Sequence, residues 1–130
     1  MTIEVIWDDE QQTVVRYIFP EAWTWEEFFA AVDTAKAMID TAPGWVGVIM
    51  DGPTRTMKVP PNMISNTKQV LSRTHPKTKI VVVVINNPFI NVMVTTLSRI
   101  SGMRGRILVS TEDLNEARRM VREHLATLAP

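Results

Sequence analysis

Apolar residues follow two different spacings along this chain, and the two spacings alternate. Short, nearly continuous apolar runs have the length and composition of β-strands, and they cover residues 3–7, 13–19, 45–50, 80–85 and 106–109. In the segments between and after these runs, apolar residues recur every three or four positions, as on a helix with one buried face. The predicted order of elements is therefore ββαβαβαβα.

Helix starts are marked by capping residues. Thr24 and Glu27 have the spacing of a capping box, and Trp23 and Phe28 have the spacing of a hydrophobic staple, so a helix is expected from residue 24 to the Pro43-Gly44 stop. The later helices are expected to begin at Pro60-Pro61, at Asn87 and within Ser110 to Asp113.

The runs at 45–50 and 80–85 do not alternate, which is typical of parallel strands buried on both faces. Only Asp8 to Gln12 separate the first two runs, so these should form an antiparallel hairpin with a solvated tip. We expect a single α/β domain over residues 1–130, with a five-stranded, mostly parallel sheet, one antiparallel edge strand and helices mainly on one face. A doubly wound order is the alternative. In the one-sided order, a partner subunit or long loops would have to cover the free face of the sheet.

The amino-acid composition restricts the classes of protein to which the chain can belong. With 45% hydrophobic and 22% charged residues the chain is typical of globular proteins. It has no cysteine and no apolar run of membrane-spanning length, so we expect a cytoplasmic protein without a membrane span. Phosphate-binding glycine loops and nucleophile motifs are missing from the sequence, and His75 and His124 have no metal-ligand spacing. We therefore predict no catalytic residue, no metal and no cofactor.

Charge is distributed unevenly. The first fifty residues contain nine acidic and two basic side chains, whereas residues 52–111 contain nine basic and no acidic ones. This favours attraction between the two parts, within the fold or between subunits; a binder of an anionic polymer through 52–111 is a further alternative. Nucleic acid is the less favoured partner, because the pI is near 6.7 and no recognition motif is present. Eight methionines and four tryptophans lead us to expect a homodimer.

Several segments carry a resemblance to a known family, and they include residues 24–29, 46–51, 81–86 and 110–117. They resemble the STAS domain, the sulfate-transporter and anti-sigma-factor-antagonist family, and its SpoIIAA-like relatives, which are also similar to lipid-binding modules. The resemblance implies a small regulatory or binding domain. In antagonists of that family a serine near the second helix is phosphorylated. Here Thr54 and Thr56 are the hydroxyl residues of the corresponding loop, so they are weak candidates for phosphorylation.

The candidate site follows from the predicted topology. Ligands collect outside the carboxyl ends of parallel strands, where helix N-termini present free N–H groups. We expect a shallow site there for a small polar or anionic ligand or a regulatory protein's loop, with Arg55 supplying the charge. The residues are Asp51, Thr54, Arg55, Thr56, Asn86, Asn87 and Ser110. The alternative is that Asp51, Asn87 and Ser110 only cap helices and turns.

These observations predict a small regulatory or ligand- or partner-binding module without catalytic machinery. The alternative is an enzyme or carrier that takes a small or lipid-like substrate at the carboxyl edge of the sheet. A deep apolar cavity behind that edge would favour the alternative, and a shallow edge would favour partner binding.

Overall fold

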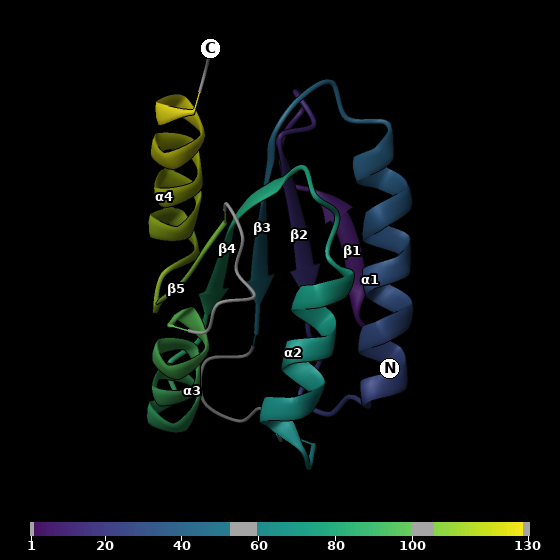
Figure 1. Ribbon diagram of the computed structural model, residues 1–130, viewed down its shortest axis with the longest axis vertical. Helices are drawn as coiled ribbons and strands as arrows, with labels where there is room; N and C mark the ends of the chain where they lie inside the picture. The colour runs from purple at the N-terminus through teal and green to yellow at the C-terminus, as the bar shows by residue number, and fades with distance from the viewer. Residues whose placement is uncertain (1, 53–59, 100–105, 129–130) are drawn as a thin grey trace.

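The computed structural model describes residues 2–52, 60–99 and 106–128. A five-stranded sheet has the spatial order β1-β2-β3-β4-β5 (Figure 1). Strands β1 and β2 are antiparallel, and the other neighbours are parallel, which confirms the predicted fold class. The elements are β1 Glu4–Trp7, β2 Val14–Ile18, α1 Trp25–Asp40, β3 Val46–Asp51, α2 Met63–Arg73, β4 Thr78–Val84, α3 Pro88–Ser98, β5 Ile107–Thr111 and α4 Leu114–Thr127.

The helices cover the two faces of the sheet unequally. Helices α1, α2 and α3 pack on one side, called here the α1–α3 face, and α4 packs on the other side, the α4 face. Each crossover advances by one strand in the same direction, which keeps the three connecting helices on one side. Helix α4 follows β5, the edge strand of the sheet, and packs mainly against β4 and β3 on the other face. The cover predicted from a partner subunit or loops is therefore supplied, over these two strands, by the chain itself.

The unbroken apolar run of β4 reflects this two-sided burial. Val81 belongs to the core under α1–α3, while Ile80, Val82 and Val84 belong to the core under α4. Gly47 on β3 lies directly under α4, where an added Cβ would overlap Val121. The absence of a side chain at this position lets the helix approach the sheet closely.

The helix starts agree closely with the sequence signals. Thr24 forms the full capping box with Glu27, and the staple rings of Trp23 and Phe28 lie 5.4 Å apart. Helix α2 begins at Met63, slightly later than predicted from Pro60-Pro61, and its N-cap Asn62 has a left-handed φ of 60°. Asn87 and Asp113 cap α3 and α4 with their side chains.

Two basic side chains that are distant in the sequence donate hydrogen bonds at the carboxyl ends of helices. Lys77 Nζ donates to the Ala42 carbonyl at 2.9 Å, just beyond α1. Arg106 donates to the carbonyls of Leu71 and Thr74 at 2.8 and 3.4 Å, at the end of α2. Burial lowers the pKa of Arg106, but a guanidinium stays protonated across the working pH range. These contacts give hydrogen-bond donors to carbonyls at helix ends, where the helix itself supplies few; the Leu71 carbonyl also accepts from Thr74 N.

Two further cations of the span 52–111 lie over aromatic rings. Arg73 Cζ is 4.6 Å from the centroid of Phe29, and Lys79 Nζ is 4.3 Å from that of Trp45. These four cations thus contact carbonyls and rings, whereas His75 contacts an acidic side chain of the first fifty residues, Asp40, at 2.7 Å. The attraction expected between the acidic and basic parts stays a prediction. Within the described residues no helix has the length and apolar character to cross a membrane.

Candidate functional site

The carboxyl ends of the parallel strands meet at one edge of the sheet, at the bottom of Figure 1. Asp51 is paired in register with Val84, and Val84 with Thr111. Helices α2 and α3 begin beside this edge (Figure 1). Of the predicted site residues, Asp51, Asn86, Asn87 and Ser110 are described, whereas Thr54, Arg55 and Thr56 lie outside the described residues.

The described site residues do not converge on one face. Asp51 follows Ile49 in the alternation of β3 and lies on the α4 face, whereas Ser110 follows Leu108 on β5 toward the α1–α3 face. Asn87 Oδ1 accepts hydrogen bonds from Phe89 N at 2.9 Å and Ile90 N at 3.3 Å. Asn86 is exposed. The capping alternative therefore holds for Asn87, and a ligand-binding role for these residues stays a prediction.

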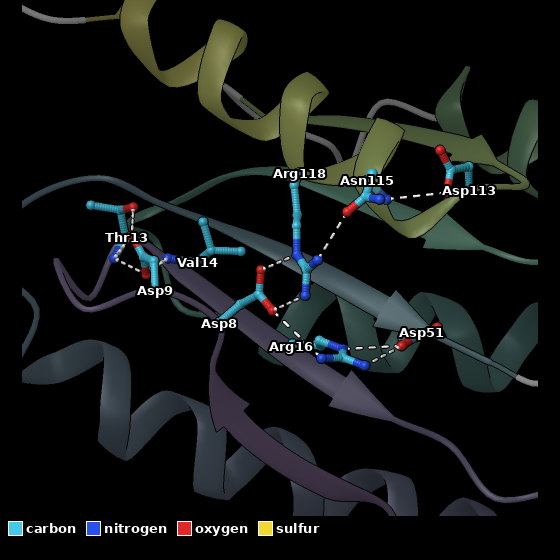
Figure 2. A network of polar contacts seen from close by, with 9 residues as sticks. All are labelled: Asp8, Asp9, Thr13, Val14, Arg16, Asp51, Asp113, Asn115 and Arg118. Atoms are coloured by element: carbon cyan, nitrogen blue, oxygen red, sulfur yellow. Dashed lines mark hydrogen bonds and ion pairs between the residues drawn. The ribbon is translucent and has the colours of Figure 1, made fainter.

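Asp51 belongs to a polar network on the α4 face (Figure 2). Arg16 donates to Asp51 Oδ2 from Nε at 3.0 Å and from Nη2 at 2.8 Å, and its Nη1 lies 3.6 Å from Asp8 Oδ1. Arg118 on α4 donates to the two carboxylate oxygens of Asp8 at 2.8 and 3.0 Å. These hydrogen bonds raise the pKa of Arg118. The network joins the hairpin, β3 and α4, which gives Asp51 a structural role.

The hairpin tip is solvated at Glu10 to Gln12, as expected, but not at Asp8 and Asp9. The side chain of Asp8 is only 6% exposed, because it lies under α4 against Arg118. Asp9 Oδ1 accepts from Thr13 N at 2.9 Å and Val14 N at 3.0 Å, so it closes the turn. No local pattern marks Asp8 as buried, since its partner Arg118 is far away in the sequence.

An apolar cavity of about 60 Å³ lies behind the carboxyl edge, between the sheet and the helices α2 and α3. In the described part of its lining, the only polar side-chain groups are the hydroxyl of Thr67 and the indole N–H of Trp23. Flexible Met50, Met63 and Met93 contribute to the wall. The other lining residues are Phe19, Phe28, Gly52, Val70, Leu71, Val81, Val83, Val84, Ile85, Ile90, Val94, Leu97 and Leu108.

The two polar groups of the cavity wall are weakly satisfied. Thr67 Oγ1 lies 3.9 Å from Met93 Sδ, a contact between α2 and α3. Trp23 is 6% exposed, and its Nε1 has no hydrogen-bond partner among the described residues. A buried donor without an acceptor destabilises the folded chain. Trp23 therefore adds one buried donor, without a partner among the described residues, to the residues that line the cavity.

A wider groove of about 1140 Å³ lies at the opposite, amino edge of the sheet. It runs between the hairpin, the loop before β3 and the second half of α4, and its lining includes Trp45, Lys77 and Arg122. Its residues come from positions far apart in the sequence, and no motif links them. No sequence pattern predicts this groove.

The protein is an α/β domain in which α1, α2 and α3 cover one face of the sheet and α4 covers the other, with an apolar cavity at the carboxyl edge. No protein-family model matches the chain, and comparisons with curated proteins and with solved structures likewise give no match. The resemblance to the STAS and SpoIIAA-like families stays a prediction from the sequence.

Proposed function

We propose that this chain is a small binding module, without catalytic machinery, whose ligand places an apolar group in the cavity between the sheet and α2 and α3. The observation that carries the proposal is the cavity itself, which lies behind the carboxyl edge and is lined by apolar side chains. Small-molecule sites are mostly apolar, with few polar groups that fix orientation. Of the functions considered from the sequence, this supports the carrier alternative over a shallow polar site.

The size and composition of the wall restrict the ligand. An engineered cavity of about 150 Å³ binds benzene, so a ligand of that size would have to widen a cavity of about 60 Å³. Met50, Met63 and Met93 supply the freedom to do so, because unbranched thioether side chains repack at low strain. The fitting group is slim, such as an acyl chain or a small ring.

The unsatisfied indole N–H of Trp23 favours a ligand that also carries a hydrogen-bond acceptor. A ligand with a carbonyl, ether or carboxylate oxygen beside its apolar part could accept a hydrogen bond from Trp23 Nε1. A purely aliphatic ligand would leave this donor unsatisfied. We therefore favour an amphipathic molecule with one acceptor group, such as a medium-chain fatty acid.

Lauric acid is the probe for this proposal. It should raise the unfolding temperature in proportion to the logarithm of its concentration, and it should shift the tryptophan emission, since Trp23 lines the cavity. The variant Thr67→Phe fills the gap between α2 and α3 and should abolish both effects. Thr34→Phe, at an exposed position of α1, is the control and should bind as the parent does.

Equal binding by the parent and the Thr67→Phe variant would locate lauric acid elsewhere and overturn the proposal. No binding of lauric acid or of its methyl ester by the parent would overturn it as well. The predicted homodimer, and phosphorylation at Thr54 or Thr56, stay separate predictions that this assay does not address.

A further inference from the structure

Three large apolar side chains are exposed on the helices that wall the cavity. The relative exposure is 48% for Ile64 on α2, and 58% and 66% for Phe89 and Val92 on α3. We call these three residues the α2–α3 patch. Single exposed apolar residues are ordinary, but three on adjacent helices form a surface feature that calls for a partner.

Helical spacing places the patch beside the groove between the two helices. Thr67 and Met93 mark the line where α2 and α3 touch. Ile64 precedes Thr67 by three residues and Phe89 precedes Met93 by four, so each lies one turn away on the same side of its helix. Thr67 and Met93 also line the cavity. Ile64 and Phe89 therefore lie one turn from residues of the cavity wall, and Val92 follows Phe89 by three residues on α3.

The charges around the patch are of one sign. Lys68 on α2 and Arg99 at the end of α3 are exposed, and within the described residues neither forms an ion pair. By contrast, Arg73, Lys77, Lys79 and Arg106 are engaged with rings or carbonyls. No acidic residue occurs between 52 and 111, so neither helix carries a negative charge. The free cations of the described basic span thus flank the apolar patch.

The apolar patch and the positive charges beside it favour one kind of binding partner over another. A symmetric contact with a second copy would oppose each patch to itself and bring like charges together without a neutralising acid. An anionic bilayer offers what the surface lacks, because exposed apolar side chains enter the headgroup boundary while basic side chains meet lipid phosphates.

We infer that the α2–α3 patch docks the protein on the surface of an anionic lipid bilayer. The inference rests on the proposed function in one respect, because it makes the bilayer the source of the amphipathic ligand. Docking there brings the wall of the cavity next to the lipid. The contact is peripheral, made by the sides of two short helices.

Vesicle flotation tests the inference. The parent should float with vesicles of phosphatidylcholine and phosphatidylglycerol, and much less with phosphatidylcholine alone. The double variant Phe89→Ser/Val92→Ser should bind at least about tenfold more weakly, because the apolar area that leaves water is lost. Ile107→Ser, at a 41% exposed position on β5, is the matched control and should float as the parent does.

The charge contribution is tested separately. Lys68→Gln/Arg99→Gln should remove the preference for anionic vesicles, and added salt should weaken the parent's binding. Equal flotation of the parent and the Phe89→Ser/Val92→Ser variant would overturn the inference, as would no flotation of the parent with either vesicle. In the second case the patch would belong to a protein partner.

Lauric acid binding keeps the two proposals distinguishable. The Phe89→Ser/Val92→Ser variant changes exposed positions only, so it should still bind lauric acid as the parent does. Loss of flotation with retained lauric acid binding supports docking. Retained lauric acid binding without any flotation of the parent would reject docking and leave the proposed function standing.

Discussion

The contact between Asp8 and Arg118 should be the main polar attachment of α4 to the sheet. Arg118→Ala removes the two hydrogen bonds that reach Asp8 at 2.8 and 3.0 Å. It leaves a carboxylate that is only 6% exposed, with Arg16 at 3.6 Å as its remaining cation. A buried charge that loses its partner is strongly destabilising.

The magnitude follows from these distances and exposures. Breaking a buried pair costs about 3–5 kcal/mol, but Arg118 is 38% exposed and Arg16 still offsets part of the charge. We therefore expect Arg118→Ala to lower the free energy of unfolding by about 2 kcal/mol. Asp8→Ala should lower it by about 1.5 kcal/mol, because the arginine it frees can reach water. The double variant should lose about 2 kcal/mol in total, which gives a coupling energy of about 1.5 kcal/mol.

Urea unfolding followed by tryptophan fluorescence measures these values, and the dependence on urea should stay unchanged. Arg119→Ala is the matched control on the same helix, since Arg119 contacts Glu116 and Glu123 at the exposed surface. It should leave stability almost unaltered. A coupling energy below about 0.5 kcal/mol, or equal losses for the two arginines, would show that the network does not anchor α4.

Three further predictions concern the core. Gly47→Ala should lower the free energy of unfolding by about 1–3 kcal/mol in urea unfolding, because its Cβ would overlap Val121. Gly44→Ala is the control and should be nearly neutral, since a Cβ there meets nothing within 4 Å. Similar values for the two variants would contradict the close approach of α4. Burial raises the pKa of Tyr17, so its contribution to stability is complete below about pH 10 and is lost as the pH rises further. Since Tyr17 is the single tyrosine, tyrosinate absorbance should appear together with unfolding, and ionisation at about pH 10 in the folded chain would refute its burial. Arg106→Met should speed hydrogen exchange at the end of α2, and unchanged exchange there would show that the carbonyl contacts are dispensable.

The fold was largely predictable because its determinants are local. The capping box at Thr24, the cap at Asn87 and the non-alternating run at 80–85 each act over a few residues. The start of α2 was misplaced because Asn62 adopts a left-handed conformation, which gives a weaker signal than the two prolines before it. The predicted one-sided layer also had to be completed by α4, whose side chains at Ala117 and Val121 fit either face by pattern alone.

The candidate site was less predictable because it depends on contacts between distant residues. Topology placed Asp51 and Ser110 at the correct edge, but the alternation of β-strand side chains directs them to opposite faces. Arg16 and Arg118, which determine the environment of Asp51 and Asp8, lie on elements that no motif connects. The cavity depends on how completely the buried side chains fill space, and sequence patterns report which residues are buried without reporting this.

The position of the cavity nevertheless has a compositional cause. Aromatic side chains concentrate between Tyr17 and Phe29, where rings from β2, the following loop and the start of α1 pack with centroids 4.9 to 6.4 Å apart. Residues 46–88 contain no Phe, Tyr or Trp, so β3, α2 and β4 are packed with aliphatic side chains and methionine. Large rigid rings fill the first half of the α1–α3 face, and Phe19, Trp23 and Phe28 form the wall of the cavity on that side; the smaller and more flexible side chains of the second half form the rest of the wall. In the proposed function, the apolar ligand would enter beneath α2 and α3 by shifting methionines, against a half of the core that its aromatic packing holds in place.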